Sequence, residues 1–380
     1  MPYASLLKYF AVRLCVAVTL GVLLLAAVEF YAYKRYLPVG DPLEPAVKLD
    51  MAATGSAAER EYWNEFIQAN KVGYHQFVLW RRLPYSGELL AIDREGVRRT
   101  LHTRCNDNDN DQTFTIWMFG DSVMWGAGSP DADTIPSLIA QDYEKQGKPV
   151  CIVNYAEKGW SNTQEMVGLI EQLKHAARKP DIVLFYDGGT EAFAAYQNRA
   201  ADLHSNYSSF KNFVDNWGES QKAGFSYLRQ TNTYRLLEKI AIKEPFHRKE
   251  DKPAVQRETE ALSAAVVANY VQNMNIIELL AKQYGFHPVF AWYPNLAVGH
   301  KEQTPYEQQV LAFEYKKFHD LGLTYQAVYE RGREIKNPDF HYLGDMLDDQ
   351  KSSLYVGISH LKPEGNQVVA DRLFAILEQK

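Results

Sequence analysis

Two residues of this 380-residue chain have the side-chain types of a hydrolytic nucleophile and its base. Ser122 follows the apolar, aromatic-rich run 114–119, which predicts a strand that ends at Gly120. His360 lies in SHLKPEGNQ, just before a helix that is predicted to begin at Pro363. A serine hydroxyl is a useful nucleophile near neutral pH only when an imidazole within hydrogen-bond distance accepts its proton. We therefore expect the fold to bring Ser122 and His360 together.

The elements that must position these residues alternate between strand and helix. Strands are predicted at 113–119, 149–154, 182–186 and 288–292. Helices are predicted at 136–145, 263–284, 303–321 and 363–378, and a further helix is predicted to follow a capping box formed by Ser161 and Gln164. Alternation of this kind indicates the α/β class, with a mostly parallel sheet covered by helices on both faces. In such sheets the chemistry lies where the strands end.

Four blocks of the sequence, taken in order, resemble the signature of the SGNH (GDSL-type) hydrolase superfamily. They are MFGDSVMWGAG, NYAEKGWSNTQE, FYDGGTEAF and VGISHLKPEGN. The resemblance covers about 113–380 and implies a flavodoxin-like, three-layer α/β/α fold. It implies that Ser122 is the nucleophile and His360 the general base. It also implies an oxyanion hole formed by the backbone N–H groups of Ser122 and Gly159, with Thr190 at the position of the family's asparagine.

Two positions depart from the family pattern. Thr190 replaces the asparagine, so that the third oxyanion donor would be a hydroxyl, and Gly357 replaces the aspartate that orients the histidine. Three alternatives follow: a carboxylate from elsewhere orients the base, the site operates as a Ser–His dyad, or catalysis is impaired. The carboxylates nearest to the histidine in sequence are Asp345, Asp348, Asp349 and Glu364.

The N-terminal region indicates a membrane anchor. Leu14–Val28 contains no charged residue, and the apolar run continues past Glu29 to Tyr33, which is long enough to cross a bilayer as a helix. No convincing signal-peptidase site follows the run, so we expect an uncleaved, single-pass helix. Basic residues flank it on both sides and do not settle the orientation; we expect a periplasmic or extracellular C-terminal domain because the preceding tail is short.

We divide the chain into three parts: an anchor at 1–36, a linker with an N-terminal extension packed on the domain at 37–112, and a hydrolase-like domain at 113–380. A helical insertion or lid is expected within the domain near 195–262. In the extension, 59–70 is predicted to form an amphipathic helix that buries Tyr62, Trp63, Phe66 and Ile67. The arginines at 81, 82, 98 and 99 are interpreted as structural or surface groups.

The composition gives no indication of a nucleic-acid partner, metal or cofactor. The 41 Lys and Arg residues against 47 Asp and Glu give a net charge of −6, which argues against a nucleic-acid surface. The Asp107, Asp109 and Asp111 series lacks the glycine and glutamate of a calcium loop. His287, His300, His319 and His341 lack metal-ligand spacing and are interpreted as structural. No spacing requires Cys105 and Cys151 to pair, and we expect two independent thiols.

Taken together, these features predict a membrane-anchored serine esterase. It would act on acyl esters, with O-acyl groups of an envelope polysaccharide or glycolipid as the expected substrate class. Two alternatives remain: an O-acyltransferase that uses the same Ser–His pair, and a catalytically impaired binding or scaffold protein of an envelope assembly. Trp125, Trp160 and Tyr186 border the motif loops and are candidates to line an acyl or sugar pocket, with core packing as the alternative.

Overall fold

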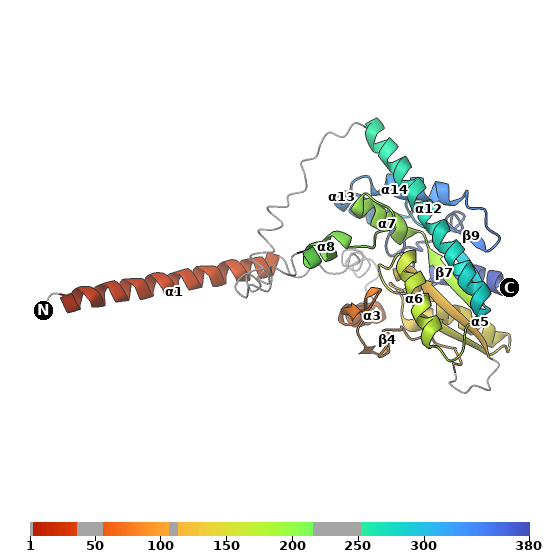
Figure 1. The fold of residues 1–380 in the computed structure, drawn as a ribbon, viewed down its shortest axis with the longest axis horizontal. Coiled ribbons are helices and arrows are strands. Elements are labelled where there is room, and N and C mark those ends of the chain that lie inside the picture. Colours follow the sequence, from red (N-terminus) through yellow and green to blue (C-terminus); the bar gives the residue numbers. More distant parts are fainter. Residues whose placement is uncertain (1–2, 36–55, 106–112, 216–251) are drawn as a thin grey trace. The chain divides into compact units, whose positions relative to one another are not determined.

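The computed structural model describes residues 3–35, 56–105, 113–215 and 252–380 (Figure 1). It separates into two compact units, which are described individually: residues 1–42 with 209–251, and residues 43–208 with 252–380. In the first unit, α1 (Tyr3–Arg35) contains the apolar stretch Val12–Tyr31, whose mean hydropathy is 2.3. By length and composition this helix can cross a membrane, as the sequence predicted.

A five-stranded parallel sheet forms the centre of the second unit. Its strand order is β6-β5-β7-β8-β9, and every neighbouring pair is parallel. The strands are β5 (Phe114–Gly120), β6 (Val150–Asn154), β7 (Ile182–Asp187), β8 (His287–Trp292) and β9 (Phe340–Tyr342). This is the flavodoxin-like order, in which the chain changes direction across the sheet beside its first strand. The predicted α/β fold is therefore confirmed.

Aromatic side chains fix the register of the three central strands. Phe119 is paired with Phe185, which is paired with Phe290 on the next strand. Their rings are stacked, with centroids 5.4 and 5.5 Å apart, and all three side chains are fully buried. Because a shift by one residue would turn these rings to the opposite face, the ladder sets the height at which each strand ends. The ends of β5, β7 and β8 carry the residues of the site described below.

Helices cover both faces of the sheet and complete three layers. One pair, α5 (Ile135–Lys145) and α15 (Pro363–Leu377), packs together. A second contiguous group consists of α6 (Asn162–His175), α7 (Gly189–Asn198), α12 (Lys252–Tyr284) and α14 (Leu321–Gly332). Figure 1 shows α6 and α12 crossing in front of the strands. The capping box predicted at the start of α6 is present.

The N-terminal extension belongs to the same compact unit as the sheet. It comprises α3 (Ala57–Ala69), β1 (Val72–His75), β2 (Leu79–Arg82), β3 (Tyr85–Ser86) and β4 (Ala91–Ile92). In α3, Tyr62, Trp63 and Phe66 are buried as predicted. Ile67, expected on the same face, is instead 60% exposed, because it follows Phe66 directly and points away from the core.

Several element boundaries differ from the sequence prediction. The helix expected at 303–321 is two helices, α13 (Pro305–Lys317) and α14, separated by Asp320 with a φ of +61°. The helix α12 begins at Lys252, which is earlier than predicted, and β9 was not predicted. Within the expected insertion, the structure describes α8 (Tyr207–Asp215). Residues 216–251 of that insertion, most of the linker, and the aspartate-rich segment at 106–112 lie outside the described residues.

Cys105 and Cys151 form a disulfide, with their Cα atoms 4.6 Å apart. The expectation of two independent thiols is therefore wrong. The cause is register, because the segment before Cys105 follows the edge strand β6: the N–H of Arg104 donates to the carbonyl of Val150 at 2.8 Å. This pairing places the two cysteines side by side, although their spacing in the sequence gave no indication of it.

Replacing both cysteines with alanine is expected to lower the free energy of unfolding by about 3–4 kcal/mol, because the bond closes a 46-residue separation. Urea denaturation of the variant and the parent chain measures this loss. Cys15, which is free and exposed, provides the control in a Cys15→Ala chain. More than one reactive thiol per chain in the unfolded, non-reduced parent would contradict the disulfide.

Candidate active site

Ser122 lies where β5 ends and the short helix α4 (Ser122–Trp125) begins. Gly120 permits this turn, because its φ is +155° and a Cβ at that position would lie 2.7 Å from the carbonyl oxygen of Tyr186. Asp121 then caps α4 by accepting the N–H of Val123 at 2.7 Å. Ser122 itself is only partly buried. A serine is therefore held at the switch point of the sheet with access to solvent.

His360 contacts this serine directly. Its Nε2 lies 2.8 Å from Ser122 Oγ, although 238 positions separate the two residues in the sequence. A tight turn holds the histidine in front of α15, because its carbonyl accepts the N–H groups of Val356 at 2.9 Å and Gly357 at 3.3 Å. The imidazole is therefore positioned to accept the hydroxyl proton.

A buried glutamate supports the loop that carries His360. Glu307 accepts the N–H of Leu354 at 3.0 Å and a hydrogen bond from the Lys301 ammonium at 2.8 Å. Burial alone would raise the pKa of Glu307, but Lys301 and the backbone donors bring this pKa below its ordinary value. The charged form is therefore favoured, and it anchors the loop to the start of α13.

Two of the carboxylates considered as orienting acids are paired with other groups. Asp345 accepts a hydrogen bond from Arg333 Nη1 at 2.6 Å. Asp348 accepts the backbone N–H of His300 at 2.8 Å and lies 3.4 Å from its Nδ1. At the position of the family's aspartate, the backbone N–H of Gly357 bonds the His360 carbonyl.

The segment 155–161, which connects β6 to α6 and is called the oxyanion loop below, runs alongside the end of β5. Its N–H groups at Tyr155 and Glu157 donate to the carbonyls of Met118 and Gly120, at 2.8 and 3.0 Å. Gly159 follows with a φ of +79°, a conformation that favours glycine. Among the described residues, no acceptor bonds its N–H. The predicted donor is thus available on the loop next to the end of β5.

Thr190, the predicted third oxyanion donor, bonds a neighbouring carboxylate in this structure. Its hydroxyl donates to Asp121 Oδ2 at 2.5 Å, and Tyr293 donates to the same oxygen. Since a hydroxyl has one hydrogen, Thr190 in this arrangement does not donate to an oxyanion. Burial raises the pKa of Asp121, while the hydrogen bonds from Thr190, Tyr293 and Val123 oppose that shift. Asp121 is therefore a hydrogen-bond acceptor that shapes the loop.

A cluster of buried acids lies behind this arrangement, and the sequence analysis missed it. Neither oxygen of Glu165 nor Oδ1 of Asp187 is bonded by an N–H group in the part of the chain that the structure describes. Burial, together with the charge of the partner carboxyl, raises the pKa of Glu165 well above its usual range. Asp187 Oδ2 accepts hydrogen bonds from Tyr270 and Asn162, at 2.9 and 3.0 Å. The two carboxyls can therefore satisfy each other by sharing one proton.

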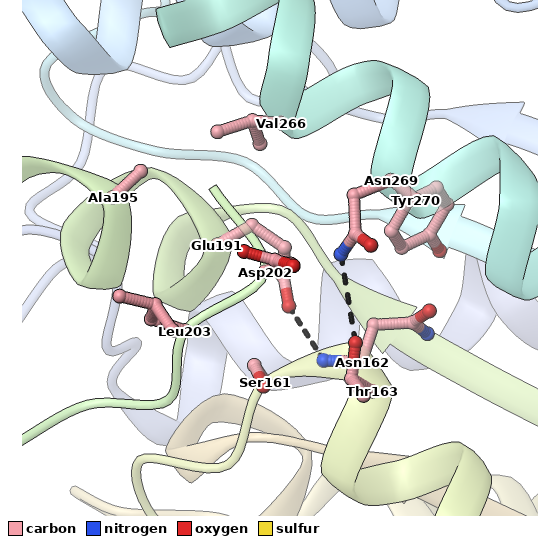
Figure 2. Close-up of a pocket in the computed structure, with 10 residues that line it drawn as sticks. All are labelled: Ser161, Asn162, Thr163, Glu191, Ala195, Asp202, Leu203, Val266, Asn269 and Tyr270. Carbon is pink, nitrogen blue, oxygen red and sulfur yellow. Dashed lines mark hydrogen bonds between the residues drawn. The ribbon is translucent and has the colours of Figure 1, made fainter. Parts of the chain in front are cut away.

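Glu191 links the second and third sequence blocks. Its carboxylate accepts the N–H of Asn162 and the N–H of Gly188, each at 2.8 Å. Glu191 also lines a pocket of about 310 Å³, open solvent at its mouth included, between α6, α7 and α12. Figure 2 shows Glu191 bonded directly to Asn162 at this pocket, with Asn269 and Tyr270 projecting from α12. Neither Ser122 nor His360 lines it.

Solved structures of lipolytic hydrolases are similar to this chain. A lipase, Lip_vut3, from a goat rumen metagenome is 13% identical with a TM-score of 0.39, covering 69% of this chain and 97% of its own. A member of the lipolytic protein G-D-S-L family from Veillonella parvula is 12% identical with a TM-score of 0.37, and the match covers 70% of this chain and 100% of the other. A putative lipolytic protein of that family from Desulfitobacterium hafniense is 12% identical with a TM-score of 0.33, and the match covers 70% of this chain and 99% of the other. No protein-family model and no curated protein matches the sequence.

The fold implied by the four sequence blocks is the one observed. The first three blocks follow the ends of β5, β6 and β7, and the fourth precedes the last helix. The strand order is the flavodoxin-like one that the SGNH resemblance implies. The resemblance is therefore confirmed for the fold.

The other candidate groups have structural roles. Trp125, Trp160 and Tyr186 are at most 1% exposed and pack in the core. The guanidinium of Arg98 is also buried, where it bonds Asp131 at 2.9 Å and the carbonyls that follow α4. His287 pairs with Asp339 at 2.9 Å. Among the described residues, no group of His, Cys, Asp and Glu side chains is arranged to bind a metal ion.

Thr190→Val is expected to lower the free energy of unfolding by about 1.5–3 kcal/mol, because the buried Asp121 loses a hydrogen bond. The value of kcat should fall by less than the roughly 100-fold that the loss of an oxyanion donor costs. Thr190→Ser retains the hydroxyl and is the control. Urea denaturation and ester hydrolysis measure the two effects. A loss of activity of about 100-fold or more at unchanged stability would assign the hydroxyl to the oxyanion instead.

Glu191 is expected to make stability depend on pH. Burial, with a contribution from Asp121, raises its pKa from 4.5 to about 7. Between these values the folded chain binds more protons than the unfolded chain, so the free energy of unfolding falls as pH rises. Glu191→Gln should flatten this slope by up to about 1.4 kcal/mol per pH unit in urea titrations. Glu330→Gln, at an exposed position, is the control; an unchanged slope in Glu191→Gln would contradict the assignment.

Proposed function

We propose that this protein is a membrane-tethered serine esterase of the SGNH type. The observation that carries the proposal is the 2.8 Å contact between Ser122 Oγ and His360 Nε2 at the carboxyl edge of the sheet. Both residues are partly exposed, so an ester can approach them. Similar structures include lipases and esterases, and an ester hydrolase is the coarse function that this fold accommodates.

The chemistry follows from these two side chains. Ser122 Oγ attacks the ester carbonyl while His360 takes its proton, and the resulting oxyanion accepts hydrogen bonds from backbone N–H groups of Ser122 and Gly159. His360 then returns the proton to the alcohol that leaves, which gives an acyl-enzyme. Water, deprotonated by His360, attacks the acyl carbonyl; the bond to Ser122 Oγ breaks as His360 returns the proton to that oxygen, and the carboxylic acid is released. With Thr190 bonded to Asp121, two backbone donors carry the stabilisation.

The disulfide and α1 support a location outside the cytoplasm. Disulfides persist in oxidising compartments, which favours a periplasmic or extracellular position for the unit that contains Cys105 and Cys151. The apolar helix α1 would then hold the enzyme at the membrane surface. O-acyl groups on an envelope polysaccharide or glycolipid are the substrates that we propose for an esterase in this position.

The full-length chain in detergent is expected to react with a fluorophosphonate probe and to hydrolyse a p-nitrophenyl ester. Ser122→Ala should abolish both reactions, because the probe bonds to the serine oxygen. His360→Ala should slow acylation by about 100- to 10,000-fold through the loss of the general base. Gel fluorescence and stopped-flow absorbance measure the two reactions.

Two matched controls accompany this test. Ser352→Ala changes an exposed serine and should retain full labelling. Asp348→Ala should have little effect, because Asp348 is paired with His300. If Asp348→Ala were as damaging as His360→Ala, then Asp348 would be the orienting acid. No labelling of the parent chain at any pH would overturn the esterase.

The second candidate is a non-catalytic binding or scaffold protein with this fold. It is favoured by two observations: the hydroxyl of Thr190 is bonded to Asp121, and a glycine stands at the position of the orienting aspartate. The same labelling experiment separates the candidates, because a scaffold has no need of a reactive serine.

A further inference from the structure

The strand β2 of the N-terminal extension holds the oxyanion loop from both sides of Gly159. The indole N–H of Trp80 donates to the carbonyl of Lys158 at 3.1 Å. The indole N–H of Trp160 donates back to the carbonyl of Trp80, also at 3.1 Å. These two buried hydrogen bonds fix the residues that precede and follow the glycine.

A buried carboxylate strengthens the same contact. Glu157 is fully buried, and it accepts the N–H of Arg82 at 2.7 Å and the N–H of Lys158 at 2.8 Å. The Arg82 Nε lies 3.6 Å from the carboxylate. Burial raises the pKa of Glu157, and the charges of Arg82 and Arg81 oppose that shift. Glu157 thus ties the backbone of β2 to the backbone of the loop.

Cation–aromatic and polar contacts extend this attachment along the loop. The Arg81 guanidinium lies over the Trp160 ring, 4.6 Å from its centroid. Gln164 Nε2, in the first turn of α6, donates to the carbonyl of Val78 at 2.8 Å. The loop therefore meets the extension from Glu157 to the start of α6, and its conformation depends on residues outside the catalytic region.

The backbone N–H of Gly159 is the group that this attachment positions. Among the described residues it has no acceptor, and the Trp80 ring lies 3.8 Å from the place that a Cβ of Gly159 would occupy. A backbone donor stabilises an oxyanion only if it is held at about 2.7–3.1 Å from that oxygen. A loop that moves by a fraction of an ångström would weaken this bond.

We infer that Trp80 is a positioning residue for the Gly159 amide, so that the N-terminal extension completes the oxyanion hole. This inference rests on the proposed function, because it requires an acyl-enzyme on Ser122. Trp80 contacts neither Ser122 nor His360 in the described interactions and acts through the carbonyl of Lys158. The effect should be large for a serine hydrolase, since the Thr190 hydroxyl is bonded to Asp121 and gives no third donor.

The test compares two esters in the full-length chain. Trp80→Phe removes the N–H and retains most of the apolar ring. With a p-nitrophenyl ester, kcat is expected to fall about 10- to 100-fold, because a displaced donor loses part of the stabilisation that a complete loss of the donor would remove. The KM of the variant should stay within about twofold of the KM of the parent. The matched thionoester forms a sulfur anion that accepts hydrogen bonds weakly, so its kcat should fall less than about threefold.

Trp292→Phe is the matched control, because Trp292 is a buried indole of β8 that packs against Tyr270 and Tyr329 and not against the oxyanion loop in the described ring contacts. It should leave the oxo-to-thiono rate ratio unchanged. Amide hydrogen exchange of 155–161 provides a readout independent of turnover, and it should become faster in Trp80→Phe but not in Trp292→Phe. Thermal melting of each variant checks that the chain is folded.

The outcomes separate this inference from the proposed function. If the parent turns over through Ser122 and Trp80→Phe retains its kcat, or loses equal activity on both esters, then the positioning role is overturned and the esterase stands. If the parent shows no Ser122-dependent turnover, the esterase is overturned and the positioning role with it. In that case, faster amide exchange of the oxyanion loop in Trp80→Phe would show only that Trp80 holds the loop in place.

Discussion

The buried carboxylate of Asp121 is the interaction on which the site depends. It accepts hydrogen bonds from the N–H of Val123, from Thr190 at the start of α7 and from Tyr293 at the end of β8. A buried carboxylate is costly unless several donors compensate for its lost hydration, so each of these bonds is needed. One side chain thereby joins the ends of β5, β7 and β8, and it holds the turn that presents Ser122.

This arrangement explains how the chain accommodates both departures from the family pattern. Thr190 bonds Asp121 and thereby ties the start of α7 to the turn that carries Ser122. At the other departure, Gly357 uses its backbone to hold the carbonyl of His360. In this structure both positions therefore make contacts that shape the loops around Ser122 and His360.

Local patterns made much of the fold predictable from the sequence. The strands β5, β6, β7 and β8 are short apolar runs bounded by turn residues, and the capping box of α6 is a local signal. The split between α13 and α14 was missed, because the segment was interpreted as one continuous helix although Asp320, with a φ of +61°, lies two residues before Gly322. The strand β9 has only three residues and lacks an apolar run.

The parts of the site that escaped prediction are the long-range ones. Ser122 and His360 were found because each lies in a recognisable block. The disulfide depends on which segment lies beside β6, and the raised pKa of Glu165 depends on its burial beside Asp187, which belongs to another element. Neither contact can be predicted from the spacing of the residues along the chain. The bond between Thr190 and Asp121 is of the same kind, since it joins residues 69 positions apart.

The contact between Trp80 and the oxyanion loop has a practical consequence for where the chain can be cut. The first of the four sequence blocks lies shortly after Thr113, and a fragment trimmed there would retain both the hydroxyl of Ser122 and the imidazole of His360. It would lose β2, which bonds the oxyanion loop on both sides of Gly159. Inactivity of such a fragment would say nothing of the full chain, so an expressed fragment should include β2.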